Sequence, residues 1–64
     1  MSQNDLILTH LRKGPITPIE ALQNYGCLRL AARILDLKRA GHKIVGEKIH
    51  SRDKVFSQYR LIRD

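Results

Sequence analysis

Residues 27–41, CLRLAARILDLKRAG, impose the strongest constraint on how this chain can fold. Its largest apolar residues recur at i, i+4 and i+7, the spacing of an amphipathic helix: Leu30, Ile34 and Leu37. Gly41 follows the last helical residues, where a left-handed C′ position favours glycine. The pattern therefore predicts a helix that packs this stripe inward, with Cys27 and Ala31 beside the stripe and a small, cationic face opposite.

The chain has 64 residues, which suffice for one small core, so a single domain over residues 1–64 is expected. Its formal net charge is +6, and the whole excess lies from Leu28 onward, where ten basic residues accompany four acidic ones. Before Leu28 the basic and acidic side chains balance. This asymmetry favours a surface that binds a polyanion; a basic surface that only aids solubility is the alternative.

A first helix is predicted after Ser2, which can cap it together with Asp5 in a variant of the capping box. The inward stripe of this helix is Ile7, Leu8 and Leu11. The pair Gly14-Pro15 ends the helix, and Ile16 follows as an extended residue that is expected to point into the core.

The segment Thr17-Pro18-Ile19-Glu20 predicts the start of a second helix. Thr17 suits the N-cap, Pro18 suits the first helical position, and Glu20 completes a capping box. The helix is expected to run to about Tyr25 and to be broken by Gly26. Its expected inward residues are Ala21, Leu22 and Tyr25.

Residues 42–49 and 55–62 are rich in β-branched and aromatic side chains and predict two strands of a hairpin. The polar, cationic residues 50–54 form its expected tip. Tyr59 and Leu61 are expected to face the helices, with the opposite side formed by Phe56, Gln58 and Arg60. Gly46 is a candidate position for a bulge.

Three helices followed by a two-stranded hairpin predict a mainly α fold of the winged helix-turn-helix class, in which the hairpin is the wing. In that arrangement the third helix reads the major groove of double-stranded DNA. The outward side of this helix is expected to present Arg29, Ala32, Arg33, Asp36 and, near one edge, Arg39.

Two arginines on this helix have the residue type and spacing for reading bases. Arg29 and Arg33 are four residues apart, and an arginine can donate two parallel hydrogen bonds to guanine O6 and N7. Ala32 keeps the helix surface low for close approach to the groove floor. For Arg33 the alternative is an ion pair with Glu20 or Asp36.

The wing tip is expected to contact phosphates or the adjacent minor groove through Arg52 and Lys54. The complete set of candidate DNA-binding residues is Arg29, Arg33, Ala32, Asp36, Arg39, Arg52, Lys54 and Thr17. Further lysines extend the basic surface, with ordinary solvated positions as the alternative: Lys38, Lys43 and Lys48.

The run GPITPIEAL-x3-GC-x-RLAARILDLKRAGHKI resembles small helix-turn-helix domains that are common in bacteriophages and prophages. The resemblance extends from about Leu6 to Ile44, and a Tyr-Arg-Leu strand at residues 59–61 resembles the last strand of that family. It implies a winged helix-turn-helix fold with Arg29 and Arg33 on or beside the reading surface. Wing sequences vary, so the resemblance implies nothing about residues 51–54.

The sequence points to no cofactor, metal site or enzymatic activity. It has no C-x2-C or H-x3-H spacing, no glycine-rich phosphate loop and no base partner marked for Cys27. A single cysteine cannot form an internal disulfide and fits a reducing compartment. No apolar run approaches the ~20 residues of a membrane span, so a cytoplasmic protein is expected.

Two functions from different classes remain open. The first is a small DNA-binding protein, a phage-derived transcriptional regulator or excision-type architectural factor. The second is a winged-helix module for protein interaction, such as a phage inhibitor of a host nucleic-acid enzyme. Leu28 and Leu35 are expected away from the core centre, either under the wing or first helix or in a self-association patch. A homodimer is one such outcome, because one small winged helix covers few base pairs.

Overall fold

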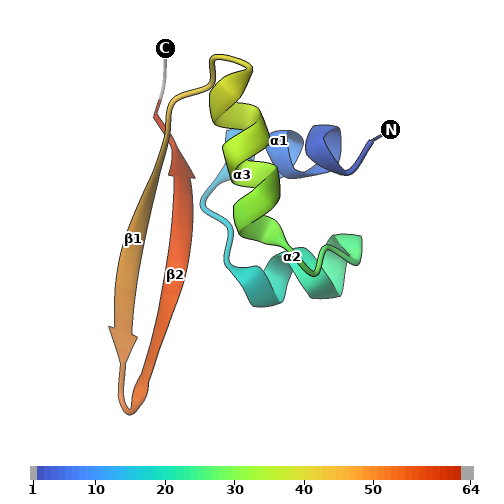
Figure 1. The fold of residues 1–64 in the computed structure, drawn as a ribbon. Helices are drawn as coiled ribbons and strands as arrows, with labels where there is room; N and C mark the ends of the chain where they lie inside the picture. Colours follow the sequence, from blue (N-terminus) through green and yellow to red (C-terminus); the bar gives the residue numbers. More distant parts are fainter. Residues whose placement is uncertain (1, 63–64) are drawn as a thin grey trace.

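The structure is a computed structural model that describes residues 2–62 and confirms the predicted winged helix-turn-helix architecture. Helix α1 spans Gln3–Lys13, α2 spans Pro18–Tyr25 and α3 spans Leu30–Arg39, and they precede strands β1 (Ile44–Ser51) and β2 (Lys54–Leu61). The two strands form an antiparallel hairpin, the wing. The wing runs beside α3, and its far half extends beyond the helices (Figure 1).

Both predicted capping boxes are present. At α1 the Ser2 hydroxyl accepts from the Asp5 backbone N–H at 3.2 Å, and the Asp5 carboxylate accepts from the Ser2 N–H at 3.4 Å. At α2 the Thr17 hydroxyl accepts from the Glu20 N–H at 3.2 Å. One Glu20 carboxylate oxygen accepts from the Thr17 N–H at 3.0 Å and from its hydroxyl at 3.1 Å. Each cap satisfies donors that a helix start would otherwise leave free.

Replacing Thr17 with Ala is expected to lower the free energy of unfolding by about 0.5–2 kcal/mol, because the cap of α2 loses its side-chain acceptor. Thermal and urea unfolding measure this change. Thr9→Ala is the control, since its hydroxyl bonds the Asp5 carbonyl within α1 and caps no helix start. Equal stability of the Thr17 variant and the parent would contradict the capping role.

The turn between α2 and α3 is longer than predicted. We expected Cys27 to lead directly into the third helix, with Leu28 at its start, but α3 begins at Leu30 with Arg29 as its N-cap residue. The reason is that Cys27 belongs to the end of α2, because its N–H donates to the Ala21 carbonyl at 3.1 Å. Gly26 makes this turn possible with a left-handed φ of 65°.

The core lies where the three helices meet the base of the wing. The stripe predicted for α3 is buried, and Ile34 at its centre is 2% exposed. Ile16 is completely buried, as predicted, and Cys27 is 1% exposed, which fits a small hydrophobic side chain. The buried cluster comprises Ile7, Leu11, Ile16, Ala21, Cys27, Leu30, Ile34, Leu37 and Ile44, with Leu8, Tyr25, Tyr59 and Leu61 packed against it.

Four apolar residues lie outside this core. The helical pattern predicted two of them at or beside the core, and for the other two it left packing under the wing or the first helix as one alternative. Leu22 was predicted to face inward but is 47% exposed on α2. Ala31 was predicted beside the buried stripe but is exposed on α3. Leu28 is 82% exposed and Leu35 is 47% exposed, so neither packs under the wing or α1. The turn at residues 26–29 shifts Leu28 out of the helical phase that the pattern assumed.

The end of α3 has the hydrogen bonds of a Schellman motif. The Gly41 N–H donates to the Lys38 carbonyl at 3.0 Å, and the His42 N–H donates to the Leu37 carbonyl at 3.1 Å. Gly41 has a φ of 105°, in agreement with the predicted left-handed position. His42 therefore still belongs to the helix end, and β1 begins at Ile44 rather than at residue 42.

The hairpin is regular from base to tip. Its register runs without interruption from Ile44 opposite Leu61 to Ser51 opposite Lys54, so the predicted bulge at Gly46 is absent. Gly46 instead lies opposite Tyr59, where a Cβ atom would come within 3.2 Å of the tyrosine ring. The glycine thus leaves room for an aromatic ring that packs on the core.

The wing tip is a two-residue turn formed by Arg52 and Asp53, shorter than the predicted tip of residues 50–54. Polar residues flank the turn, but backbone pairing continues through them as far as Ser51 and Lys54. Arg52 has a φ of 53°, a conformation that favours glycine at the first position of such a turn. The hairpin therefore holds a cation at its end in a backbone conformation that disfavours an arginine.

One residue of the α1–α2 connection joins the wing to the helices. Ile16 and Tyr59 exchange two backbone hydrogen bonds, both 2.9 Å long, so Ile16 acts as a single-residue third strand beside β2. Tyr59 and Leu61 pack against the helical core as predicted. On the opposite side Arg60 is exposed, but Phe56 and Gln58 are half-buried and line a hollow with the start of α2. The position of the wing is therefore fixed at its base.

Candidate nucleic-acid interface

The N-terminal end of α3 lies beside a hollow that separates it from the wing. The lining residues come from the start of α2, from the turn before α3 and its first residues, and from β2: Pro18, Leu28, Arg29, Leu30, Ala31, Ala32, Ser57 and Tyr59. Arg29 is exposed and contributes a cation to this hollow. Within the described residues, its side chain makes no capping hydrogen bond to α3. The guanidinium group is therefore available to a ligand that approaches between the helix and the wing.

Arg33 is in a different environment from Arg29. Its guanidinium lies 3.1 Å from the Asp36 carboxylate, which is one of the ion pairs that the sequence allowed. Both side chains are partly buried, with 33% of Arg33 and 39% of Asp36 exposed. The Arg33 Nε is buried and has no hydrogen-bond partner among the described residues. These two candidate residues therefore neutralise each other on one flank of α3.

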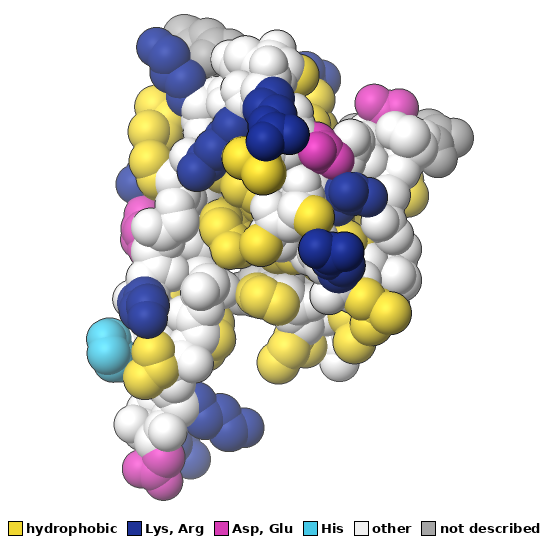
Figure 2. Space-filling view, in the orientation of Figure 1, with side chains coloured by type: hydrophobic (Ala, Val, Ile, Leu, Met, Phe, Trp, Pro, Cys, Tyr) yellow, Lys and Arg dark blue, Asp and Glu magenta, His cyan; other side chains and the backbone are white. Residues whose placement is uncertain are grey.

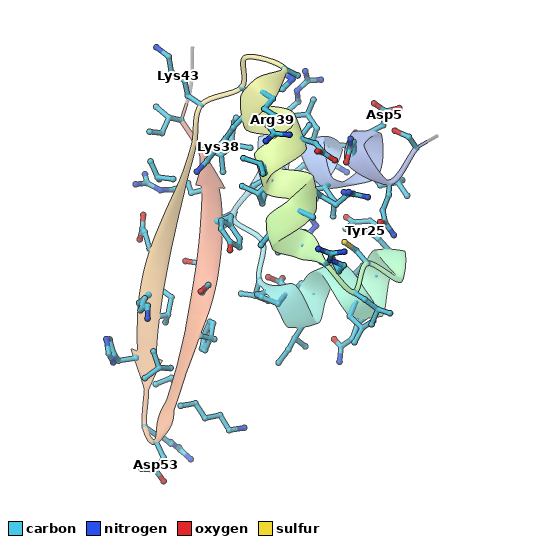
Figure 3. The ribbon with its side chains drawn as sticks, viewed as in Figure 1. Asp5, Tyr25, Lys38, Arg39, Lys43 and Asp53 are labelled. Carbon is cyan, nitrogen blue, oxygen red and sulfur yellow. The ribbon has the colours of Figure 1, made fainter. Side chains whose placement is uncertain are left out.

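The C-terminal half of α3 adds further cations. Lys38 points from α3 toward the wing, and Arg39 lies on the front of the helix (Figure 3). Both are exposed, as is Lys43 at the base of the wing. Figure 2 shows lysine and arginine side chains from this end of the molecule down to the wing tip, on the same face as α3.

The wing tip also carries exposed cations. Arg52 and Lys54 flank Asp53, which points away from the end of the hairpin (Figure 3). Farther up the wing, Glu47 is paired with Arg60 at 2.9 Å. Two of the acidic side chains described in the second half of the chain, Asp36 and Glu47, are thus engaged with arginines. The exposed cations of α3 and the wing tip dominate the remaining charge.

The remaining candidate, Thr17, is half-buried at the start of α2, and its hydroxyl is engaged in the capping box. Ala32 is half-buried beside the hollow, as its small side chain allows. The structure thus brings Arg29 and Ala32 together near one end of α3. It places Arg39 at the other end and Arg52 with Lys54 at the wing tip.

Two residues beside this surface were not predicted from the sequence. Pro18 and Ser57 line the hollow, although they are distant in sequence from α3. Their proximity depends on the bridge between Ile16 and Tyr59, which no local pattern signals. Leu35 was predicted away from the core centre and is exposed, whereas Ala31 was predicted beside the buried stripe and is exposed instead.

The other polar residues have structural roles. The His10 ring of α1 contacts the Tyr25 hydroxyl of α2 at 2.7 Å. Its other ring nitrogen lies 3.1 Å from the Pro15 carbonyl oxygen in the α1–α2 connection. Because a carbonyl can only accept, Nε2 donates to Pro15, and in the neutral ring Nδ1 then accepts from the Tyr25 hydroxyl. Residues 2–62 contain no cluster of three or more histidine, cysteine or acidic side chains suited to a metal ion.

The family comparison agrees with this geometry. The sequence profile of a winged helix-turn-helix domain matches residues 2–63. Comparisons with curated proteins and with solved structures gave no significant match. Among the described helices, none has both the length and the apolar character needed to cross a membrane. The profile spans all three helices and the wing, and the chain therefore belongs to the winged helix-turn-helix family.

Proposed function

We propose that this protein binds double-stranded DNA as a phage-derived transcriptional regulator or excision-type architectural factor of the bacterial cytoplasm. The observation that carries the proposal is the exposed cationic surface shared by α3 and the wing (Figure 2). A winged helix places its third helix in the major groove, and phosphate contacts along the flanks require cations. We assign no catalytic step or cofactor to this surface.

The proposal gives the candidate residues different roles. Arg29, at the start of α3, contacts a base edge, because the N-terminal residues of a reading helix approach the bases. Arg39, Arg52 and Lys54 contact phosphates, which position the protein without reading sequence. Ala32 permits close approach. Thr17 holds α2 in place, and the ion pair of Arg33 with Asp36 flanks the reading surface.

Enrichment of bound fragments from a random DNA library tests this function. The expected result is a short enriched motif whose binding weakens steeply with added salt, because bound cations displace counterions from the phosphates. Light scattering of the complex measures its stoichiometry, and a symmetric motif bound by two chains would support a homodimer. Absence of both an enriched motif and salt-dependent binding would contradict the function.

Changing both Arg52 and Lys54 to Ala is expected to weaken binding to selected and random DNA alike. The slope of log K against log salt should become shallower by about one to two units, because each lost phosphate contact removes about 0.9 unit. Arg12 with Lys13, both changed to Ala, is the matched control, since it removes the same charge from the exposed end of α1. A salt slope of the Arg52 and Lys54 variant equal to that of the parent protein would place the wing tip away from DNA.

A second candidate function is protein binding by the same fold, such as inhibition of a host nucleic-acid enzyme. The observation that favours it is the exposed apolar surface of α2, where Ile19 is 64% exposed and Leu22 is 47% exposed. An apolar protein interface responds weakly to salt, so the salt series also separates this function from DNA binding.

A further inference from the structure

An exposed apolar surface runs from the turn before α3 along the outward side of that helix. Leu28 and Leu35 are 82% and 47% exposed, Ala31 is exposed and Ala32 is half-buried. We call Leu28, Ala31, Ala32 and Leu35 the apolar strip. Exposed apolar side chains of this size gain free energy when a partner covers them. Because the strip lies on the predicted reading helix, the partner that covers it bears directly on what this helix recognises.

The charges around the strip identify the chemistry of the partner. Arg29 lies between Leu28 and Ala31 at the start of the strip, and Lys38 and Arg39 follow Leu35 at the end of α3, so cations accompany the strip at both of its ends. Figure 2 shows this mixture of cationic and hydrophobic side chains on the face of α3. An apolar protein surface would have to desolvate these cations without compensation. The DNA major groove instead offers phosphates along its rims and apolar methyl groups within it.

We propose that the apolar strip recognises thymine by packing against the C5-methyl groups that project into the major groove. The proposal rests on the proposed DNA-binding function and adds a base preference to it. Among the unmodified bases, thymine has the apolar group on its major-groove edge. Leu35 supplies the longest side chain in the helical part of the strip, and the two alanines keep the backbone near the groove floor.

The spacing of the strip fits neighbouring base pairs. Ala31 and Leu35 are one helical turn apart, which corresponds to about 6 Å along the helix axis. Successive base pairs are about 3.4 Å apart along each strand, so this separation matches about two base-pair steps. One or two thymines within a few base pairs of each other are therefore the expected targets.

Removing one thymine methyl group at a time from the DNA tests the inference. In the motif enriched from the random library, each thymine is replaced in turn by deoxyuridine, which removes the methyl group and preserves base pairing. We expect the dissociation constant to rise about fourfold at one or two positions, the effect of uncovering one apolar carbon. Other thymine positions should not respond.

Protein variants assign the response to the strip. Leu35→Ala or Leu28→Ala should remove the difference between thymine and deoxyuridine at a responding position. Leu22→Ala is the matched control, because Leu22 on α2 has the same exposed fraction of 47% as Leu35. The control should retain the full fourfold difference. Circular dichroism melting should show all three variants folded, since each alters an exposed side chain.

Two outcomes would overturn the inference while leaving DNA binding intact. One is an enriched motif in which no thymine-to-deoxyuridine change alters affinity. The other is a methyl response that both Leu35→Ala and Leu28→Ala retain in full. Failure of the library to yield any motif, together with salt-independent binding, would instead reject the proposed function itself.

Discussion

Replacing Ile34 with Ala is expected to lower the free energy of unfolding by about 2–5 kcal/mol. The side chain is 2% exposed at the centre of α3, and its removal leaves a cavity among the three helices and the wing base. A domain of this length has a total stability of about 3–10 kcal/mol. Urea unfolding followed by circular dichroism should therefore show a variant that is marginally folded or unfolded at 25 °C.

Leu35→Ala is the internal control for this measurement, because it removes the same number of carbons one residue farther along α3. Leu35 is 47% exposed, so its loss leaves no cavity in the core, and alanine favours the helix slightly more than leucine. Its stability should stay within about 0.5 kcal/mol of the parent. Similar losses at both positions would contradict the orientation of α3.

Arg29→Ala is expected to weaken specific DNA binding by about 1–3 kcal/mol, which is about 5- to 150-fold in dissociation constant. Arg29 is exposed at the N-cap of α3 and lines the hollow beside the wing. Loss of a two-bond contact with guanine should also relax the preference at one base pair. Titrations with the selected site and with scrambled DNA, at two salt concentrations, measure both effects.

Two further variants separate reading from charge. Arg29→Lys keeps the charge but lacks the planar pair of donors, so affinity should recover more than selectivity. Arg12→Ala removes one charge from α1 and should lower affinity for both DNAs slightly and equally. If Arg29→Ala also weakened both DNAs equally, Arg29 would be a phosphate contact; no effect on either would contradict DNA reading by α3.

Local signals in the sequence predicted the element order and most helix ends. The two capping boxes, Ser2 with Asp5 and Thr17 with Glu20, mark helix starts because their hydrogen bonds form within four residues of the chain. Gly41 marks the end of α3 because glycine readily adopts a positive φ. The predictions were wrong at positions where contacts between distant segments determine the local structure. Cys27 is drawn into the core and bonds back to α2, and this delays the start of α3. Gly46 accommodates a ring from the opposite strand, which strand composition alone cannot indicate.

The candidate interface was less predictable than the fold. Helical spacing placed Arg29 and Arg33 on one side, yet Arg29 precedes the helix and Arg33 is paired with Asp36. Pairing between neighbouring charges depends on rotamers that sequence spacing leaves open. Pro18 and Ser57 line the hollow beside α3 although they come from segments far apart in the chain.

The two hydrogen bonds between Ile16 and Tyr59 anchor the wing near its base, so a change in the angle of the wing at this point is amplified toward the tip. From Tyr59 to Lys54 the strand extends five residues, or about 17 Å at about 3.3 Å per residue. If the wing tilted by about 10° at this anchoring point, its tip would move by roughly 3 Å, which is the length of one hydrogen bond to a phosphate. A single buried residue in the α1–α2 connection thus sets the reach of charges at the opposite end of the molecule.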